Sequence, residues 1–188
     1  MMPMPCELPP NIEGVLISEQ ELERRVGELA SAISADYAGR RPLLVAPLKG
    51  AFVFLADLIR RLGMPLEVDF VRLASYGAGT EPSGPVRLTK DLETDVAGRD
   101  LLIVEDIVDT GESLGYLIEA LQRRSPASLR VCALLDKPER RRRDVRVDYR
   151  GFTIPDRFVV GYGLDCGEKY RELPYVGIMK REAPSPSE

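Results

Sequence analysis

An acidic stretch in the middle of the chain holds the residue types best suited to chemistry. In LLIVEDIVDTGESL, an apolar run leads into three carboxylates and a turn of small and hydroxylated residues: Glu105, Asp106, Asp109, Thr110, Gly111, Glu112 and Ser113. Ligands of open parallel sheets bind at the carboxyl ends of the strands, so we expect Glu105 and Asp106 to face a crevice. The N–H groups of a turn that opens a helix favour an anion such as phosphate.

Paired acids beside a phosphate turn indicate a ligand that carries phosphate and hydroxyl groups, with a divalent metal between them. A simpler alternative is that Asp109 and Thr110 only cap the helix and that the other acids face solvent. The chain contains no histidine, which excludes Ser/His and Cys/His nucleophile pairs and imidazole zinc sites. Any proton transfer must therefore use a carboxylate, lysine, tyrosine, cysteine or water.

Alternating strands and helices are expected to position this stretch. Ser18-Glu19-Gln20-Glu21 predicts a capping box, followed by an amphipathic helix to about Tyr37. Strands are predicted at 43–48, 66–73, 101–105 and 129–135, and helices after Lys49 and at 112–123. This alternation predicts an α/β fold with a twisted, mainly parallel sheet flanked by helices.

The 188 residues suit a single domain. We expect a core over about 12–145, a smaller hood mostly from 146–180 plus the N-terminal segment, and a disordered tail at 183–188. The net charge of −4 argues against a protein that coats nucleic acid. The three cysteines, Cys6, Cys132 and Cys166, are widely spaced, and no apolar run reaches membrane-spanning length. These features favour a reducing, cytoplasmic location.

The stretch VEDIVDTGES resembles the phosphoribosyl-pyrophosphate (PRPP) binding motif of the type I phosphoribosyltransferases. The segments PLKGAFVF, VDFVRLASYG, LLDKPERR and IPDRFVVGYGLD narrow this resemblance to the hypoxanthine-guanine phosphoribosyltransferases, over about Ile12 to Lys180. It implies the α/β fold of that family with a small hood, and purine salvage with Mg²⁺. The 5-phosphoribosyl group of PRPP would pass to hypoxanthine or guanine, giving IMP or GMP and pyrophosphate. A homodimer or homotetramer is also implied.

By this resemblance, the acidic stretch binds PRPP. Glu105 and Asp106 would hold the ribose hydroxyls, partly through Mg²⁺, and Asp109 to Ser113 would hold the 5′-phosphate. Asp109 would also act as the general acid or base near N7 of the purine. Glu112 stands at the variable position of the motif, where its carboxylate is expected to turn outward and to weaken PRPP affinity.

The pyrophosphate subsite is implied by other markers. Lys49 and Gly50 resemble the pyrophosphate loop, in which a cis peptide often precedes the lysine, and Arg171 would add a second cation. Ser75 and Tyr76 resemble the dipeptide of a mobile loop that closes over the reaction and excludes water.

The base subsite is implied by the segments around Lys137 and Phe158. Lys137 would donate to the 6-oxo group, and because an ammonium carries donors only, it would reject the amino group of adenine. Phe158 would stack on the purine, with the Val159 backbone at its edge. Asp165 matches an acid that binds a metal or pyrophosphate.

Two rival functions stay open at the level of sequence. One is a transferase for another base, above all xanthine, which also has a 6-oxo group. The other is a PRPP-sensing, RNA-binding regulator on the same fold, suggested by the arginine run 140–143. We expect that run to be a solvated loop, and nothing in the sequence explains its two extra members, Arg142 and Arg143.

Overall fold

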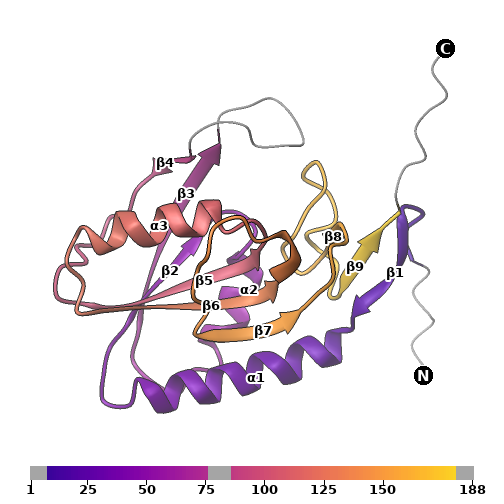
Figure 1. Ribbon diagram of the computed structural model, residues 1–188. Coiled ribbons are helices and arrows are strands. Elements are labelled where there is room, and N and C mark those ends of the chain that lie inside the picture. The colour runs from indigo at the N-terminus through magenta and orange to yellow at the C-terminus, as the bar shows by residue number, and fades with distance from the viewer. Residues whose placement is uncertain (1–7, 76–85, 181–188) are drawn as a thin grey trace.

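Figure 1 shows the computed structural model, which describes residues 8–75 and 86–180. Cys6, Tyr76 and the tail at 183–188 lie outside these residues. The elements in chain order are β1 (Ile12–Ile17), α1 (Glu19–Asp36), β2 (Leu43–Pro47), α2 (Phe52–Ile59), β3 (Glu67–Ser75), β4 (Val86–Lys90), β5 (Asp100–Val108), α3 (Glu112–Gln122), β6 (Ser128–Asp136), the 3₁₀ turn η1 (Pro138–Arg140), β7 (Tyr149–Thr153), β8 (Val159–Val160) and β9 (Val176–Met179).

The larger sheet has the strand order β4-β3-β2-β5-β6-β7. All neighbours pair in parallel except β4, which runs antiparallel to β3. Successive side chains of a strand point to opposite faces: Leu44 and Leu102 pack with α1 and α2, whereas Leu43 and Leu101 pack with α3. Helices therefore cover both faces (Figure 1), and the predicted mainly parallel α/β architecture is confirmed.

The helix α1 begins with the predicted capping box. Ser18 Oγ accepts a hydrogen bond from the N–H of Glu21, whose carboxylate accepts one from the N–H of Ser18. This exchange satisfies two backbone donors that the first turn would otherwise leave unpaired. None of the helices in residues 8–75 and 86–180 is long and apolar enough to cross a bilayer.

A smaller sheet in the order β1-β9-β8 stands beyond the carboxyl ends of β5, β6 and β7 (Figure 1). Its buried residues Val159 and Val176 belong to the same apolar cluster as α1 and α2, so the two sheets share a core. The hood was expected to come mostly from 146–180, but Tyr149–Thr153 forms β7, the edge strand of the larger sheet. Its alternating pattern buries Tyr149 beside α1, and the strands of the smaller sheet are β1 from the N-terminal segment and, after Val159, β8 and β9.

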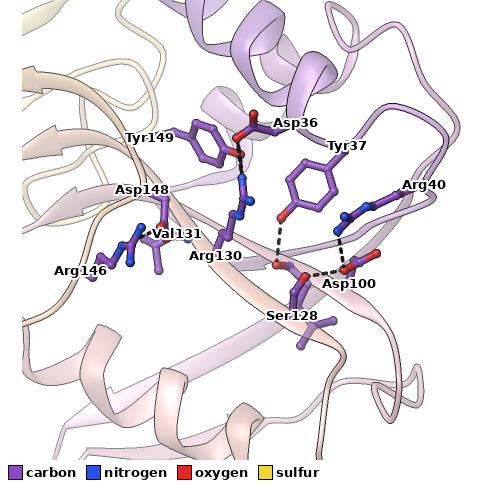
Figure 2. A network of polar contacts seen from close by, with 11 residues as sticks. Asp36, Tyr37, Arg40, Asp100, Ser128, Arg130, Val131, Arg146, Asp148 and Tyr149 are labelled. Atoms are coloured by element: carbon purple, nitrogen blue, oxygen red, sulfur yellow. Dashed lines mark hydrogen bonds and ion pairs between the residues drawn. The ribbon is translucent and has the colours of Figure 1, made fainter.

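A polar network ties α1 to β6 and β7 at the amino-terminal ends of these strands (Figure 2). Asp36 Oδ2 accepts hydrogen bonds from Tyr149 Oη at 2.7 Å and from Arg130. The guanidinium of Arg130 also lies 5.6 Å from the ring centre of Tyr37, within cation–π range. The network thus lies at the amino-terminal edge of the sheet, opposite the carboxyl-terminal edge where the candidate active site is found.

Candidate active site

The strand β5 carries its two acids before it ends. It was predicted to end at Glu105 but continues to Val108, because Val108 still pairs with Asp136 of β6. Glu105 and Asp106 are consecutive strand residues and point to opposite faces. Burial raises the pKa of both carboxyls, and the adjacent Asp106 charge raises the pKa of Glu105 further. Glu105 Oε2 is buried and accepts no hydrogen bond from any residue that the structure describes.

These two carboxyls fit a divalent cation that is shared with substrate. A buried, unpaired carboxylate oxygen such as Glu105 Oε2 needs a partner, and carboxylates suit hard cations. Among the described residues, no three metal-binding side chains gather closely enough to hold an ion by themselves. Asp165, the third predicted metal ligand, instead lies 2.8 Å from the guanidinium of Arg171. The arrangement suits a cation that completes its shell with phosphate oxygens and water.

The turn between β5 and α3 presents backbone donors at a helix start. Gly111, with a φ of 85°, is the N-cap of α3, and Glu112 and Ser113 are exposed in its first turn. The simpler alternative was that Asp109 and Thr110 cap this helix. The cap position is Gly111, so Asp109 does not cap it, whereas Thr110 Oγ1 accepts a hydrogen bond from the N–H of Glu112 at 3.4 Å. The N–H groups of Glu112 and Ser113 stand where an anion is favoured.

The turn after β2 approaches the β5 acids. The Leu48–Lys49 peptide is cis, as the family resemblance led us to expect. A Cβ at Gly50 would lie 1.7 Å from Asp106 Oδ2, so only glycine lets this turn come so close. Lys49 Nζ lies 3.1 Å from the carboxylate of Glu168, in the loop that joins β8 and β9.

Arg171 belongs to that same β8–β9 loop. Its guanidinium contacts Asp165 at 2.8 Å and Glu168 at 3.2 Å, and donates to the carbonyl oxygen of Gly163 at 2.7 Å. Its Nε is buried and has no hydrogen-bond partner among the described residues. A buried donor without a partner is available to a ligand anion.

The other end of the site combines a buried amine with an exposed ring. Lys137 follows β6 and is only 5% exposed, and this burial lowers its pKa. Its Nζ lies 4.0 Å from Asp156 Oδ1, beyond hydrogen-bond range. Phe158 is 58% exposed, unusual for a large apolar side chain, while its neighbour Val159 is buried in β8. A planar apolar ligand with an acceptor group would satisfy both Lys137 and Phe158.

One cleft of about 440 Å³ joins these two ends. Nine of the predicted site residues line it: Lys49, Gly50, Asp106, Asp109, Lys137, Phe158, Val159, Asp165 and Arg171. Glu105 and the turn residues Thr110, Gly111, Glu112 and Ser113 lie beside the cleft rather than in its lining. Ser75 is the last residue of β3, and its predicted partner Tyr76 lies outside the described residues.

Sequence reasoning missed two charged residues of the cleft, Arg140 and Asp156. Arg140 Nε lies 2.9 Å from Asp109 Oδ1, and Arg140 Nη1 lies 3.4 Å from Asp156 Oδ1. Asp156 stands two residues before Phe158, and Arg140 stands three residues after Lys137, so proximity to predicted residues was the available signal.

The arginine run is only partly the solvated loop that we expected, because Arg140 and Arg142 are exposed whereas Arg141 and Arg143 are half-buried. Arg141 pairs with Asp136, whose side chain is 1% exposed, and Arg143 pairs with Glu119 of α3. Only Arg142 forms no ion pair with a residue in 8–75 or 86–180. Three of the four arginines thus pair with carboxylates of the described residues, which weakens the RNA-binding alternative.

Comparison with known proteins places the chain in a family. The phosphoribosyl transferase domain matches residues 16–166. The hypoxanthine-guanine phosphoribosyltransferase of Bacillus subtilis (strain 168) is 49% identical over 170 residues, which cover 90% of this chain and 94% of that protein. The protein of the same name from Lactococcus lactis subsp. lactis is 50% identical over 171 residues, 91% of this chain and 93% of the relative.

Solved structures support the same family assignment. A crystal structure of a hypoxanthine phosphoribosyltransferase from Staphylococcus aureus has a TM-score of 0.87 and 44% identity, and covers 90% of this chain and 92% of that chain. The chain belongs to the phosphoribosyltransferase family. The resemblance to the hypoxanthine-guanine members is confirmed, and so is the family's α/β fold. Members of this family generally need a divalent metal.

Proposed function

We propose that this protein transfers the 5-phosphoribosyl group of PRPP to hypoxanthine and guanine, giving IMP or GMP and pyrophosphate, as a purine salvage enzyme. The observation that carries the proposal is the single cleft that joins Asp106 and the two cations Lys49 and Arg171 to Lys137 and Phe158. The first group suits a charged phosphorylated sugar, and the second suits a flat base with an oxo group.

The PRPP half of the site would use the acids and the turns. Glu105 and Asp106 would hold the ribose hydroxyls and Mg²⁺, which when bound neutralises charge on the phosphates. The backbone donors from Asp109 to Ser113 would hold the 5′-phosphate. Lys49, the N–H of Gly50 and Arg171 would receive the pyrophosphate, with Asp165 holding the guanidinium of Arg171 in place.

The base half of the site would set specificity. Lys137 would donate to the 6-oxo group, while Phe158 would stack on the ring and the Val159 backbone would contact its edge. Because Lys137 is nearly buried, an amino group at the 6-position would leave this donor unsatisfied, and such a mismatch rejects an analogue strongly. This argument excludes adenine but does not separate guanine from xanthine.

Chemistry would take place between the two halves. N9 of the base forms a bond to the anomeric carbon of the ribose, while the bond from that carbon to pyrophosphate breaks and its electron pair leaves with pyrophosphate. The base loses one proton, which Asp109 would accept near N7. General-base catalysis of this kind contributes about 10²–10⁴ to a rate.

Steady-state turnover of the purified protein with PRPP and Mg²⁺ tests the proposal, with hypoxanthine, guanine, xanthine, adenine and uracil supplied separately. We expect release of pyrophosphate with hypoxanthine and guanine and none with adenine or uracil. Preference for xanthine would correct the substrate. PRPP binding without turnover of any base would instead favour the regulator. We also propose that the protein forms a homodimer or homotetramer and that it is cytoplasmic. Size-exclusion chromatography with light scattering measures the mass of the oligomer.

A further inference from the structure

The loop after β6 is fastened to the end of β5 by backbone hydrogen bonds. The N–H of Lys137 donates to the carbonyl oxygen of Val108 at 2.9 Å. Further along the loop, the N–H groups of Arg142 and Arg143 both donate to the carbonyl oxygen of Thr110, at 2.9 and 3.0 Å. These bonds fix the loop on either side of Asp109.

Arg141 anchors the loop after β6 through its side chain. Its guanidinium pairs with Asp136, and Arg150 of β7 contacts the other oxygen of that carboxylate at 2.7 Å. Asp136 is almost fully buried, and a buried carboxylate with two guanidinium partners holds its surroundings in one arrangement. The backbone that carries Arg140 is therefore held in place by contacts other than those of the Arg140 side chain.

The side chain of Arg140 reaches from this fixed loop into the cleft. Its Nε lies 2.9 Å from Asp109 Oδ1, and its Nη1 lies 3.4 Å from Asp156 Oδ1. Two carboxylates on different segments thus hold the guanidinium from two sides. The guanidinium is planar and its donors are fixed relative to one another, so the hydrogen bond from Nη1 to Asp156 sets its plane and keeps its charge beside Asp109 Oδ1.

The two oxygens of Asp109 differ in their surroundings. Oδ1, the oxygen beside Arg140, is buried, yet the whole side chain is 40% exposed. The exposure of this side chain therefore comes from its other atoms, in a residue that lines the cleft. Arg140 therefore contacts the buried oxygen, Oδ1, and leaves Oδ2 available to a ligand.

We infer that Arg140 is a positioning residue for Asp109. Its charge holds the carboxylate so that the other oxygen is left for the base. Oδ1, which lies 2.9 Å from Arg140 Nε, is buried and accepts no hydrogen bond from the described residues, so the contact is an ion pair. The inference rests on the proposed function, in which Asp109 accepts a proton from the purine. Arg140 acts through Asp109: its guanidinium pairs with Asp109 and Asp156 and forms no ion pair with any other described residue.

The contact between Arg140 and Asp109 could instead be inhibitory. In that reading Arg140 occupies Asp109 until a base displaces it, and its removal would speed turnover. The separate environments of the two oxygens favour the positioning role, since the contact with Arg140 leaves the cleft-facing side of the carboxylate free.

Kinetics of Arg140→Gln test the inference. We expect kcat with hypoxanthine and saturating PRPP to fall by about tenfold, because a displacement of about 1 Å of a catalytic group can cost up to a hundredfold. The KM for PRPP should stay within about twofold, since the PRPP contacts are untouched. Arg140→Lys, which keeps the charge but loses the fork, should recover part of kcat. Arg142→Gln is the matched control in the same loop, and its kcat should equal that of the unchanged protein.

A double-mutant cycle supplies the decisive measurement. If Arg140 works through Asp109, Arg140→Gln should have no further effect on kcat in an Asp109→Asn background. An independent loss in that background would overturn the inference, as would an unchanged or raised kcat in Arg140→Gln alone. An Asp109→Asn variant with normal turnover would instead remove the proposed role of Asp109, and this result separates failure of the proposed function from failure of the inference.

Discussion

Glu105 and Asp106 are placed where carboxyl groups bind ligands well and stabilise the fold poorly. Burial raises the pKa of Asp106 to about 6, whereas an aspartate in an unfolded chain titrates near 4. Between these values the unfolded chain gives up its proton first, so the contribution of Asp106 to stability is full below about pH 4 and is lost as the pH rises through 6. The same acid that prepares the site for a cation therefore weakens the free protein at neutral pH.

Asp106→Asn should reverse this loss while abolishing activity. The amide keeps an oxygen for the N–H of Ile107, which donates to Asp106 at 2.9 Å, but carries no charge to desolvate. We expect the variant without ligands to gain about 1–3 kcal/mol in free energy of unfolding at pH 7.5, from one to two pKa units at 1.36 kcal/mol each. At pH 4 the gain should vanish. Urea unfolding at the two pH values measures both.

The control for this prediction is Asp165→Asn, which neutralises a neighbouring acid with the opposite role. Asp165 is paired with Arg171, so its amide should not stabilise the protein at pH 7.5. A stability of Asp106→Asn no greater than that of the unchanged protein at pH 7.5 would contradict the account of the buried pair.

At the level of elements, the capping box should contribute to the stability of α1 without affecting the active site. Ser18→Ala removes the hydroxyl that accepts from the N–H of Glu21 and should cost about 1 kcal/mol. For a chain of this length that corresponds to a fall of about 2–4 °C in Tm, with KM and kcat unchanged. Ser31→Ala is the control, since the Ser31 hydroxyl only bonds back to the carbonyl of Gly27 within the same helix. A Tm loss in Ser31→Ala equal to that in Ser18→Ala would show that the cap is not responsible.

Elements with a strong local signal could be predicted from sequence, and elements defined by distant partners could not. The capping box and the spacing of Leu22, Val26, Leu29 and Ile33 mark α1 without tertiary information. By contrast, β4 and β7 are edge strands of five residues each, and their identity comes from the neighbours they pair with. The extension of β5 to Val108 likewise depends on its pairing with β6.

In the whole molecule, the cleft forms where the two sheets meet. Asp106, Asp109 and the two lysines of the cleft could be predicted, because each stands in or just after an apolar strand within a family motif. The pairing of Arg140 with Asp109 and Asp156 could not, since it depends on the path of the loop after β6, which Asp136 and Thr110 hold in place. A run of four arginines looks the same in sequence whether its charges face water or a buried carboxylate.

Gly163 is the point at which the β8–β9 loop touches the turn after β2. Its φ is 100°, and a Cβ there would lie 2.2 Å from the carbonyl oxygen of Gly50. Gly163 also accepts a hydrogen bond from Arg171 through its own carbonyl oxygen. The hood and the pyrophosphate turn are thus in backbone contact, so a side chain at this position must push them apart.

Gly163→Ala should therefore lower stability and weaken PRPP binding together. The matched control is Gly167→Ala in the same loop, which has a φ of 60° but no atom within 4 Å of the added Cβ. Both variants place an alanine at positive φ, which at the left-handed Gly167 costs about 1–2 kcal/mol. Gly163→Ala adds the clash with Gly50 and the strain of a φ of 100°, so we expect it to be the less stable by about 1–3 kcal/mol or more. We expect the KM for PRPP to rise at least tenfold in Gly163→Ala and to stay within about twofold in Gly167→Ala, because only the first displaces Arg171 and the Gly50 turn. Equal KM values in the two variants would mean that the contact between hood and turn does not shape the pyrophosphate subsite.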